Sequence, residues 1–392
     1  MNNAPKLNLI MFNMSKYSDW QKGIANRNYH VLHNLVKRDE VNKVIAVDFI
    51  PFNWKRAVKT YIYDQILNDT RGDIVYGDLT SRCWQISSKI LVYSTIDSLL
   101  NPEKIISELN KIIDKEEMRD NLIVWNYDPF YTDYFNKYNQ VLNIFDAVDD
   151  WSTHSSYNKY AGTLRRNYET IKLKSDLIFT VSEYLKKKIF DNQTNCFWLA
   201  NAVDLQNFQN ETKIHPLLKN IKKPIIGFLG ILQDRIDTEI LTYLVEKNPD
   251  KSLVLAGPVW QNFTKKKLRK YSNIHFLGLI KHPDIPSLYN GFDCGIIPYK
   301  TNDFIKSIDP MKIYEYLAAG LPIVSTPISG LERFSNLIGF ADSPENFNNA
   351  VNYSLNLDKN EIKRQAWPIL EQNTWDIRIG EMLELINQKL TP

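Results

Sequence analysis

Short apolar runs alternate with amphipathic stretches along most of this chain. In its first half each run is bounded by polar or turn residues, which is typical of buried strands. These runs are residues 7–12, 44–49, 122–127, 141–148 and 176–182. An amphipathic stretch from Gln21 to Lys37 predicts a helix after the first run. Strands that alternate with helices in this way predict a parallel sheet with helices on both faces.

The alternation lapses after the segment ANAVD (200–204) and then resumes. Residues 205–222 are polar and end in Lys-Lys-Pro, so we interpret them as an interdomain connection. A second series of apolar runs follows it, at residues 224–230, 252–257, 273–278, 292–299 and 322–327. A last helix is predicted from Asn373 to Leu390. The pattern therefore predicts two doubly wound, Rossmann-like α/β domains in tandem.

The length of the chain supports two domains, and its small net charge excludes one class of partner. A single core rarely grows beyond roughly 250–300 residues, and the chain has 392, of which 44% are hydrophobic. Its 48 Lys and Arg against 45 Asp and Glu leave a net charge of only +3, which argues against nucleic acid as a partner. Basic clusters at 55–59, 186–188 and 265–267 are either solvated helix faces or contacts to an anionic membrane or phosphorylated acceptor.

Cysteine spacing and hydropathy give the expected compartment. Cys83, Cys196 and Cys294 are far apart and odd in number, so neither a metal motif nor a disulfide framework is expected. A reducing cytoplasm fits them. No run approaches the roughly 18 apolar residues of a membrane span. Residues 51–64 mix aromatic and basic side chains, so this stretch either lies on the inner face of the membrane or packs as a helix with a basic outer face.

The most informative stretch is SIDPMKIYEYLAAGLPIVST, residues 307–326. Asp309 is expected to cap a helix whose first residue is Pro310. The positive helix N-terminus and the ammonium of Lys312 suit a phosphate. Glu315 lies one turn further and can accept two hydrogen bonds from a vicinal diol such as a ribose. The alternative is an ordinary surface Glu–Lys pair.

This stretch resembles the donor-binding signature of GT-B glycosyltransferases, especially those that build bacterial teichuronic acid, capsule or exopolysaccharide. Weaker resemblance extends over nearly the whole chain, through IIGFLG (225–230), HFLGLIKHPDIPSLY (275–289) and NTWDIRIGEMLELI (373–386). The resemblance implies two Rossmann-like domains that face each other across a cleft. It implies an N-terminal acceptor domain at 1–204, a linker at 205–222, a donor domain at 223–373 and a helix at 374–392 that packs back on the first domain.

The resemblance also implies roles for single residues on the donor side. The residues concerned are Gly230, Ile231, Leu279, Ile280, Ser307, Asp309, Pro310, Lys312 and Glu315. Glu315 would bind the ribose hydroxyls and Lys312 the diphosphate, with amides near Gly230 and Ile231 also facing phosphate. Backbone atoms of Leu279 and Ile280 would frame the base. Many relatives carry a second Glu eight residues before the ribose Glu, and here that position is Ser307.

Carboxylates in the first half are candidates for the base that deprotonates an acceptor hydroxyl. Asp149 and Asp150 follow an apolar run, and functional groups of parallel sheets gather at strand carboxyl ends. Adjacent carboxylates repel each other, which raises a pKa toward a useful range. Asp150 is the first choice and Asp149 the second, and helix capping is the alternative. Retaining GT-B enzymes can do without such a base.

Further acceptor-side candidates are Asp19, Trp20, Arg27, Asn126 and Asp128. Asn126 and Asp128 belong to NYDPF, which is either a contact to acceptor or a turn. For Asp19, Trp20 and Arg27 the alternative is packing at a helix start. The chain has no D-x-D triplet, no phosphate-loop motif and no G-x-G-x-x-G fingerprint. We therefore expect no metal and no cofactor beyond the donor itself.

Together these features predict a glycosyltransferase that moves a sugar from a nucleoside-diphosphate sugar to a hydroxyl acceptor. UDP is the expected nucleotide, and the expected acceptor is a glycan or lipid-linked glycan of the cell surface. Two alternatives stay open. One is a catalytically silent nucleotide-sugar-binding subunit of a polysaccharide assembly complex, which Ser307 would suit. The other is a GT-B nucleotide-sugar 2-epimerase.

Overall fold

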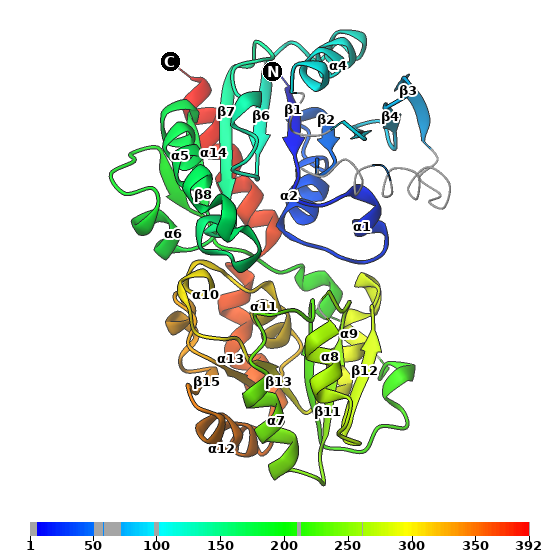
Figure 1. Cartoon of the computed structure of the whole chain (residues 1–392), viewed down its shortest axis with the longest axis vertical. Helices are drawn as coiled ribbons and strands as arrows, with labels where there is room; N and C mark the ends of the chain where they lie inside the picture. The colour runs from blue at the N-terminus through cyan, green and yellow to red at the C-terminus, as the bar shows by residue number, and fades with distance from the viewer. Residues whose placement is uncertain are drawn as a thin grey trace. The chain divides into compact units, whose positions relative to one another are not determined.

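The chain folds into two α/β units (Figure 1). One comprises Met1–Leu199 with Ile379–Pro392, and the other comprises Ala200–Arg378; we call them unit 1 and unit 2. The computed structural model describes residues 6–50, 58, 72–97, 102–209, 213–260 and 262–391. The candidate membrane-surface helix at 51–64 therefore lies outside the described residues, apart from Val58.

Unit 1 contains a sheet in which nine described strands follow the order β3-β4-β5-β2-β1-β6-β7-β8-β9. β3 and β4 pair antiparallel, β4 also pairs antiparallel with β5, and the other neighbours are parallel. The strands are β1 Leu7–Phe12, β2 Val41–Val47, β3 Asp73–Gly77, β4 Ser81–Gln85, β5 Ile90–Thr95, β6 Leu122–Asn126, β7 Leu142–Ala147, β8 Leu177–Thr180 and β9 Cys196–Trp198. All five strands predicted for this half are confirmed.

The helices of unit 1 cover the sheet. They are α1 Tyr17–Gln21, α2 Arg27–Leu35, α4 Pro102–Lys115, α5 Ala161–Lys174 and α6 Glu183–Lys188, with 3-10 turns η1 Thr132–Tyr134, η2 Trp151–Thr153 and η3 Ser155–Tyr160. The prediction of a single helix over 21–37 was wrong in one respect, because a turn separates α1, which ends at Gln21, from α2, which begins at Arg27. Gly23 adopts a φ of 98°, and the Asn26 side chain then caps α2 by accepting from the Tyr29 amide at 3.2 Å.

Unit 2 contains a six-stranded parallel sheet in the order β12-β11-β10-β13-β14-β15. Its strands are β10 Ile225–Leu229, β11 Ser252–Ala256, β12 Ile274–Gly278, β13 Cys294–Ile297, β14 Ile323–Ser325 and β15 Ile338–Phe340. The chain winds outward from β10 in one direction and from β13 in the other. The topological switch point therefore lies between β10 and β13, where doubly wound folds bind ligands at the strand carboxyl ends.

The helices of unit 2 pack on both faces of this sheet. They are α7 Thr238–Lys247, α8 Asn262–Leu268, α9 Ile285–Gly291, α10 Asp303–Ser307, α11 Met311–Ala318, α12 Pro344–Ser354 and α13 Lys359–Glu371, with the start of α14 Trp375–Leu390. Short 3-10 turns complete the unit: η4 Leu205–Phe208, η5 Pro216–Leu218, η6 His282–Asp284 and η7 Leu331–Phe334. No described helix is both long enough and apolar enough to cross a bilayer.

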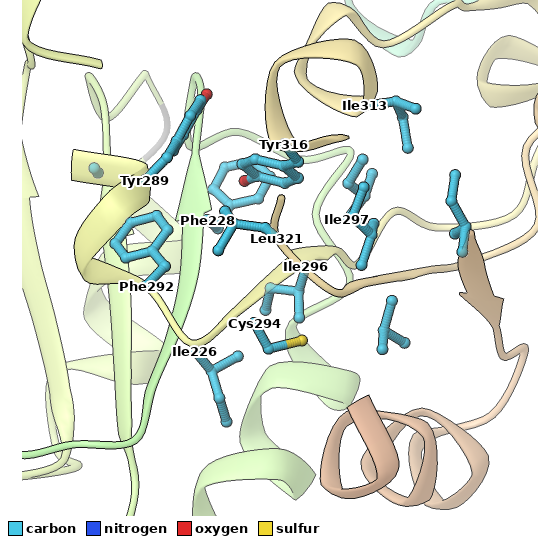
Figure 2. Close-up of a cluster of buried hydrophobic side chains, with 14 of the residues drawn as sticks. Ile226, Phe228, Tyr289, Phe292, Cys294, Ile296, Ile297, Ile313, Tyr316 and Leu321 are labelled. Atoms are coloured by element: carbon cyan, nitrogen blue, oxygen red, sulfur yellow. The ribbon is translucent and has the colours of Figure 1, made fainter. Parts of the chain in front are cut away.

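Aromatic side chains fill the space between the central strands of unit 2 and helices α9 and α11. Figure 2 shows Phe228, Tyr289 and Tyr316 packed beside the aliphatic side chains of β10 and β13. The rings of Tyr289 and Tyr316 meet at 4.9 Å, nearly perpendicular. A Cβ on Gly295 would lie 2.8 Å from the Tyr316 ring, so only glycine fits at this point of β13. This packing fixes α11 over the β10–β13 boundary.

Residues 205–222 do not form a free connection between the units. Leu205, Phe208 and Leu218 are each at most 7% exposed and belong to the core of unit 2. The ring of Phe208 stacks on Tyr289 with centroids 6.4 Å apart. The linker prediction was therefore wrong for these described residues, because a polar average concealed three apolar anchors. The division between the units falls after Leu199 and after Arg378, rather than at 204 and 373.

Candidate functional site

Helix α11 begins one residue later than predicted, and no side chain caps it. Pro310 is the N-cap residue, not the first helical residue. The Asp309 carboxylate instead accepts the Asn201 amide at 2.7 Å, the Tyr314 hydroxyl at 2.9 Å and the Arg333 guanidinium at 3.2 Å. The prediction that Asp309 caps the helix was therefore wrong. Its carboxylate braces the segment before α11, and the amides of the first turn stay without a side-chain cap.

Lys312 extends from the first turn of α11 to the switch point between β10 and β13. Its ammonium donates to the Tyr299 hydroxyl at 2.7 Å. It also lies 5.2 Å from the ring centroids of both Phe228 and Tyr299, within the range of cation–π attraction. Phe228 comes from β10 and Tyr299 follows β13, so the two strands that flank the switch point hold this one cation.

Glycines after two neighbouring strands, β10 and β11, bring the backbone close to Lys312. Gly230 follows β10 with a φ of 153°, and a Cβ there would lie 3.3 Å from the Lys312 ammonium. Gly257 follows β11, and a Cβ there would lie 2.1 Å from the Gly230 carbonyl oxygen. The Gly230 amide donates to the Ala256 carbonyl at 3.0 Å, so the expectation that this amide faces phosphate was wrong. The Ile231 amide has no hydrogen-bond partner among the described residues.

Glu315 is half-buried one turn along α11, and Tyr289 of α9 orients it. The Tyr289 hydroxyl donates to one carboxylate oxygen of Glu315 at 2.7 Å. Tyr289 itself is fully buried, and burial together with the Glu315 charge raises its pKa well above the ordinary value. The phenol thus stays a donor at all physiological pH values. Within the described residues the second oxygen of Glu315 has no protein donor, so it is available to a ligand.

The loop after β12 carries the residues expected to frame a base. Leu279 is 43% exposed and Ile280 is buried. Neither amide has a hydrogen-bond partner among the described residues. Since β12, β11 and β10 are neighbours, the carboxyl edge of the sheet runs from this loop to Gly230 and Lys312. Gly230, Leu279 and Ile280 therefore lie along one edge of the sheet, and Lys312 reaches this edge from α11.

Ser307 is completely buried, and its hydroxyl donates to the Phe304 carbonyl at 2.6 Å. The Ser307 side chain is therefore directed into the core, which does not suit the donor-binding role expected for it. A serine is short enough to turn back into its own helix end, whereas a glutamate at this position would have to extend out of the core. With serine in place of the signature's glutamate, position 307 therefore loses the negative charge and no longer directs a polar side chain out of the core.

The first-choice base, Asp150, is built into a turn of unit 1. Its carboxylate caps η2 by accepting the Ser152 amide at 3.0 Å and the Ser152 hydroxyl at 2.6 Å, and it is 3% exposed. Asp150 therefore has the helix-capping role that the sequence offered as the alternative to a catalytic base. Asp149 is partly exposed, and its carbonyl accepts the Tyr168 hydroxyl at 3.1 Å. Asp149 is thus the more accessible of the two carboxylates at the end of β7.

The NYDPF segment forms a turn at the end of β6. Asn126 is fully buried and accepts the Asp128 amide at 3.0 Å, and the Asp128 carboxylate accepts the Phe130 amide at 2.9 Å. Burial raises the pKa of Asp128 from 3.8 to about 7, although the hydrogen bond from Phe130 opposes the shift. The turn alternative therefore holds for both residues. It also leaves a carboxyl group that titrates near neutrality.

Arg27 and Trp20 are buried in unit 1, and Asp19 is half-buried at the start of α1. The Arg27 guanidinium binds both oxygens of Asp146 at 2.9 and 3.0 Å, and both side chains are at most 3% exposed. Burial raises the pKa of Asp146, and the Arg27 charge opposes this. Trp20 is 5% exposed and donates to the Ser15 hydroxyl, and Asp19 accepts the Lys16 amide at the start of α1. The acceptor role expected for Arg27 and Trp20 was wrong, because both are buried.

Comparison with known proteins shows what each part of the chain is similar to. Residues 223–356, which include Lys312, Glu315, Tyr289 and Tyr299, match the family described as "Glycosyl transferases group 1". A curated relative, the "Putative teichuronic acid biosynthesis glycosyltransferase TuaH" of Bacillus subtilis (strain 168), is 24% identical over 204 residues. That match covers 48% of this chain and 51% of the relative, so it spans about half of each protein.

Solved structures show the same architecture over nearly the whole chain. HepE of Anabaena in complex with UDP and glucose superposes with a TM-score of 0.68 at 12% identity, over 97% of this chain and 100% of HepE. Sucrose-phosphate synthase from Thermosynechococcus elongatus gives 0.73 at 12% identity, over 98% and 99%. The chain therefore has the GT-B fold. At these identities the superpositions establish the fold alone, and the family match covers residues 223–356, about a third of the chain.

Three side chains of unit 2 that lie near Lys312 and Glu315 were missed from the sequence. Tyr289 orients Glu315, and Tyr299 orients Lys312. Arg235 follows β10 and places its guanidinium 5.7 Å from the Tyr299 ring, so a second cation shares the ring that holds Lys312. Neither tyrosine carries a local sequence signal. Each reaches its partner only through packing around the sheet.

Proposed function

We propose that the chain transfers a sugar from a nucleoside-diphosphate sugar, with UDP as the expected nucleotide, to a hydroxyl group of a glycan or lipid-linked glycan during cell-surface polysaccharide synthesis. The observation that carries this proposal is the pairing of two oriented charges at the β10–β13 switch point. Lys312 is held by Tyr299 beside Gly230, and Glu315 is held by Tyr289 one turn away. The teichuronic acid description of the Bacillus relative supports the polysaccharide role.

These groups suit a departing diphosphate. Sugar transfer leaves negative charge on the nucleotide, and positive groups fixed in advance stabilise that charge without reorganising. Lys312, the uncapped start of α11 and the Ile231 amide would meet the diphosphate, and Arg235 is a further cation nearby. Glu315 would accept both ribose hydroxyls. The donor is a substrate in this proposal, and no resident cofactor or metal is part of it.

Calorimetry with UDP, uridine and pyrophosphate tests the assignment. We expect Glu315→Ala to weaken UDP and uridine by roughly 1–3 kcal/mol, the cost of losing a charged hydrogen-bond partner, and to leave pyrophosphate unchanged. Lys312→Ala should weaken UDP and pyrophosphate but spare uridine. Lys306→Ala is the matched control, because this lysine of α10 is exposed and pairs with Asp303. Equal losses for all three ligands in either variant would contradict the division of roles.

The buried Ser307 hydroxyl favours a second candidate, a silent nucleotide-sugar-binding subunit. Without a polar group from position 307, the sugar would lack one of the contacts that the family signature supplies. Thermal stabilisation by UDP, GDP, CMP and dTDP would first name the base, since ligands stabilise by mass action. Hydrolysis or transfer of the matching nucleotide sugar then separates the candidates. Binding without turnover would favour the silent subunit and contradict the transferase.

The proposal places the reaction in the cytoplasm. Cys83, Cys196 and Cys294 are free thiols and all buried, which suits a compartment that keeps cysteines reduced. A lipid-linked acceptor would bring the enzyme to the inner face of the membrane. Flotation with phosphatidylglycerol vesicles checks this step, and failure to float with them would count against a membrane-held acceptor.

A further inference from the structure

Five aromatic rings lie in one continuous group where β6 and β7 end. They are contributed by Phe130, Trp151, His154, Tyr157 and Tyr160, and we call them the aromatic platform. Tyr157 lies 5.3 Å from Trp151, 5.5 Å from His154 and 5.7 Å from Phe130, and Phe130 lies 5.7 Å from Tyr160. Each of the five side chains is only half-buried. Rings in a folded core would be covered, so this group presents part of its surface to solvent.

Hydrogen bonds from neighbouring polar side chains fix the backbone that carries the aromatic platform. The Asp150 carboxylate caps η2, which carries Trp151. The Tyr168 hydroxyl of α5 accepts the Trp151 amide at 3.2 Å and donates to the Asp149 carbonyl. On the other side, the Asn167 amide donates to the Pro129 carbonyl at 2.9 Å and so fixes the turn that carries Phe130. The rings are therefore positioned before any ligand arrives.

The composition of the platform points to a saccharide. The segment WSTHSSYNKYAGT (151–163) contains no Leu, Ile, Val or Met, and it has only one charged residue, Lys159. A lipid surface or a protein core would pack against aliphatic side chains, which this segment lacks. One face of a pyranose ring carries C–H groups that pack on the electron-rich face of an aromatic ring. Its hydroxyls, directed outward, suit the neighbouring Ser, Thr and Asn side chains.

We infer that the aromatic platform binds a pyranose unit of the acceptor saccharide by stacking. The inference rests on the proposed transferase function and adds to it the acceptor-side residues. It also gives Asp150 a role, because its carboxylate positions the platform and does not take the acceptor proton. The platform lies at the carboxyl ends of β6 and β7, the edge at which parallel sheets bind their ligands.

Saturation-transfer NMR on the full chain with UDP present tests the inference. The probes are methyl β-D-glucopyranoside, N-acetylglucosamine and glucuronic acid. We expect saturation of the axial ring protons of at least one probe. Trp151→Ala and Tyr157→Leu should each weaken that probe between about two- and tenfold. Tyr157→Leu keeps apolar volume without an aromatic face, so it remains informative if the tryptophan variant folds poorly. Tyr353→Ala, at an exposed tyrosine of α12, is the control and should change nothing.

Each result decides the inference. No saturation with the wild-type chain, or equal affinity in both platform variants, would overturn it. Loss of binding to phosphatidylglycerol vesicles in Trp151→Ala, with no change for the sugars, would also overturn it in favour of a membrane contact. UDP stabilisation of unit 2 is measured in the same samples. If UDP binds but sugars do not, the platform fails alone; if no nucleotide binds, the proposed function fails.

Discussion

Replacing Asp128 by asparagine should stabilise unit 1 in a strongly pH-dependent way. Asp128 is 6% exposed, and burial raises its pKa from 3.8 to about 7. Between these two values the folded chain keeps a proton that the unfolded chain has released. Stability therefore falls as pH rises through this window, because the unfolded state binds fewer protons. Below about pH 4 the Asp128 carboxyl is protonated in both the folded and the unfolded chain, so its raised pKa no longer lowers the free energy of unfolding.

The size of the effect follows from the two pKa values. Each unit between them corresponds to about 1.4 kcal/mol, so the full separation is worth on the order of 4 kcal/mol once the pH exceeds about 7. Asparagine removes the ionisable group but keeps an oxygen that can accept the Phe130 amide, as the carboxylate does at 2.9 Å. The variant and the wild type should therefore be similar near pH 4, and the variant should be more stable near pH 8.

Unfolding midpoints measured from pH 4 to 8 provide the assay. For a domain of this size, 1 kcal/mol moves the midpoint by roughly 2–4 °C, so the difference should grow to several degrees across the range. Asp133→Asn is the control for the substitution itself, since Asp133 is an exposed carboxylate on the following turn. A difference for Asp128→Asn that is constant, or that shrinks as pH rises, would refute the reasoning.

Three other substitutions probe the packing behind the donor site and unit 1. Tyr289→Phe removes the donor to Glu315, so UDP should bind about 1 kcal/mol more weakly by calorimetry while pyrophosphate is unaffected. Gly230→Ala forces a φ of 153° on an L-residue, so we expect a loss of about 1–3 kcal/mol in thermal unfolding together with weaker UDP binding. Arg27→Met leaves the buried Asp146 charge without its partner and should cost about 3–5 kcal/mol, whereas adding Asp146→Leu should recover most of it. Equal stability of the single and double variants would show that the ion pair is not the cause.

Strands buried on both faces could be predicted from the sequence, and exposed or very short strands could not. β1, apart from Asn8, and β10 read as continuous apolar runs because helices cover both faces of their sheets. β3 lies at the sheet edge and is largely exposed, and β15 has three residues, so neither produces a run. The average polarity of residues 205–222 also led to a wrong linker prediction, because three isolated apolar side chains pack into the core of unit 2.

The candidate site of unit 2 was partly predictable because Lys312 and Glu315 share one helix, and helical spacing is a local property. The tyrosines that orient them lie 13 and 26 residues away and arrive through the sheet topology. Asp150 illustrates a different limit. A carboxylate after a strand serves equally well as a base or as a cap, and only the position of the Ser152 amide decides between them.

The choice of a phenol to hold Lys312 has a consequence for ligand binding. In the described part of the chain no carboxylate forms an ion pair with Lys312, and its hydrogen-bond acceptor is the neutral oxygen of Tyr299. A neutral acceptor fixes the direction of the ammonium but does not cancel its charge, so nearly all of that charge remains for an incoming anion. Attraction of this kind weakens as added salt shortens the screening length. Ionic strength should therefore tune the capture of a diphosphate far more than that of the bare nucleoside.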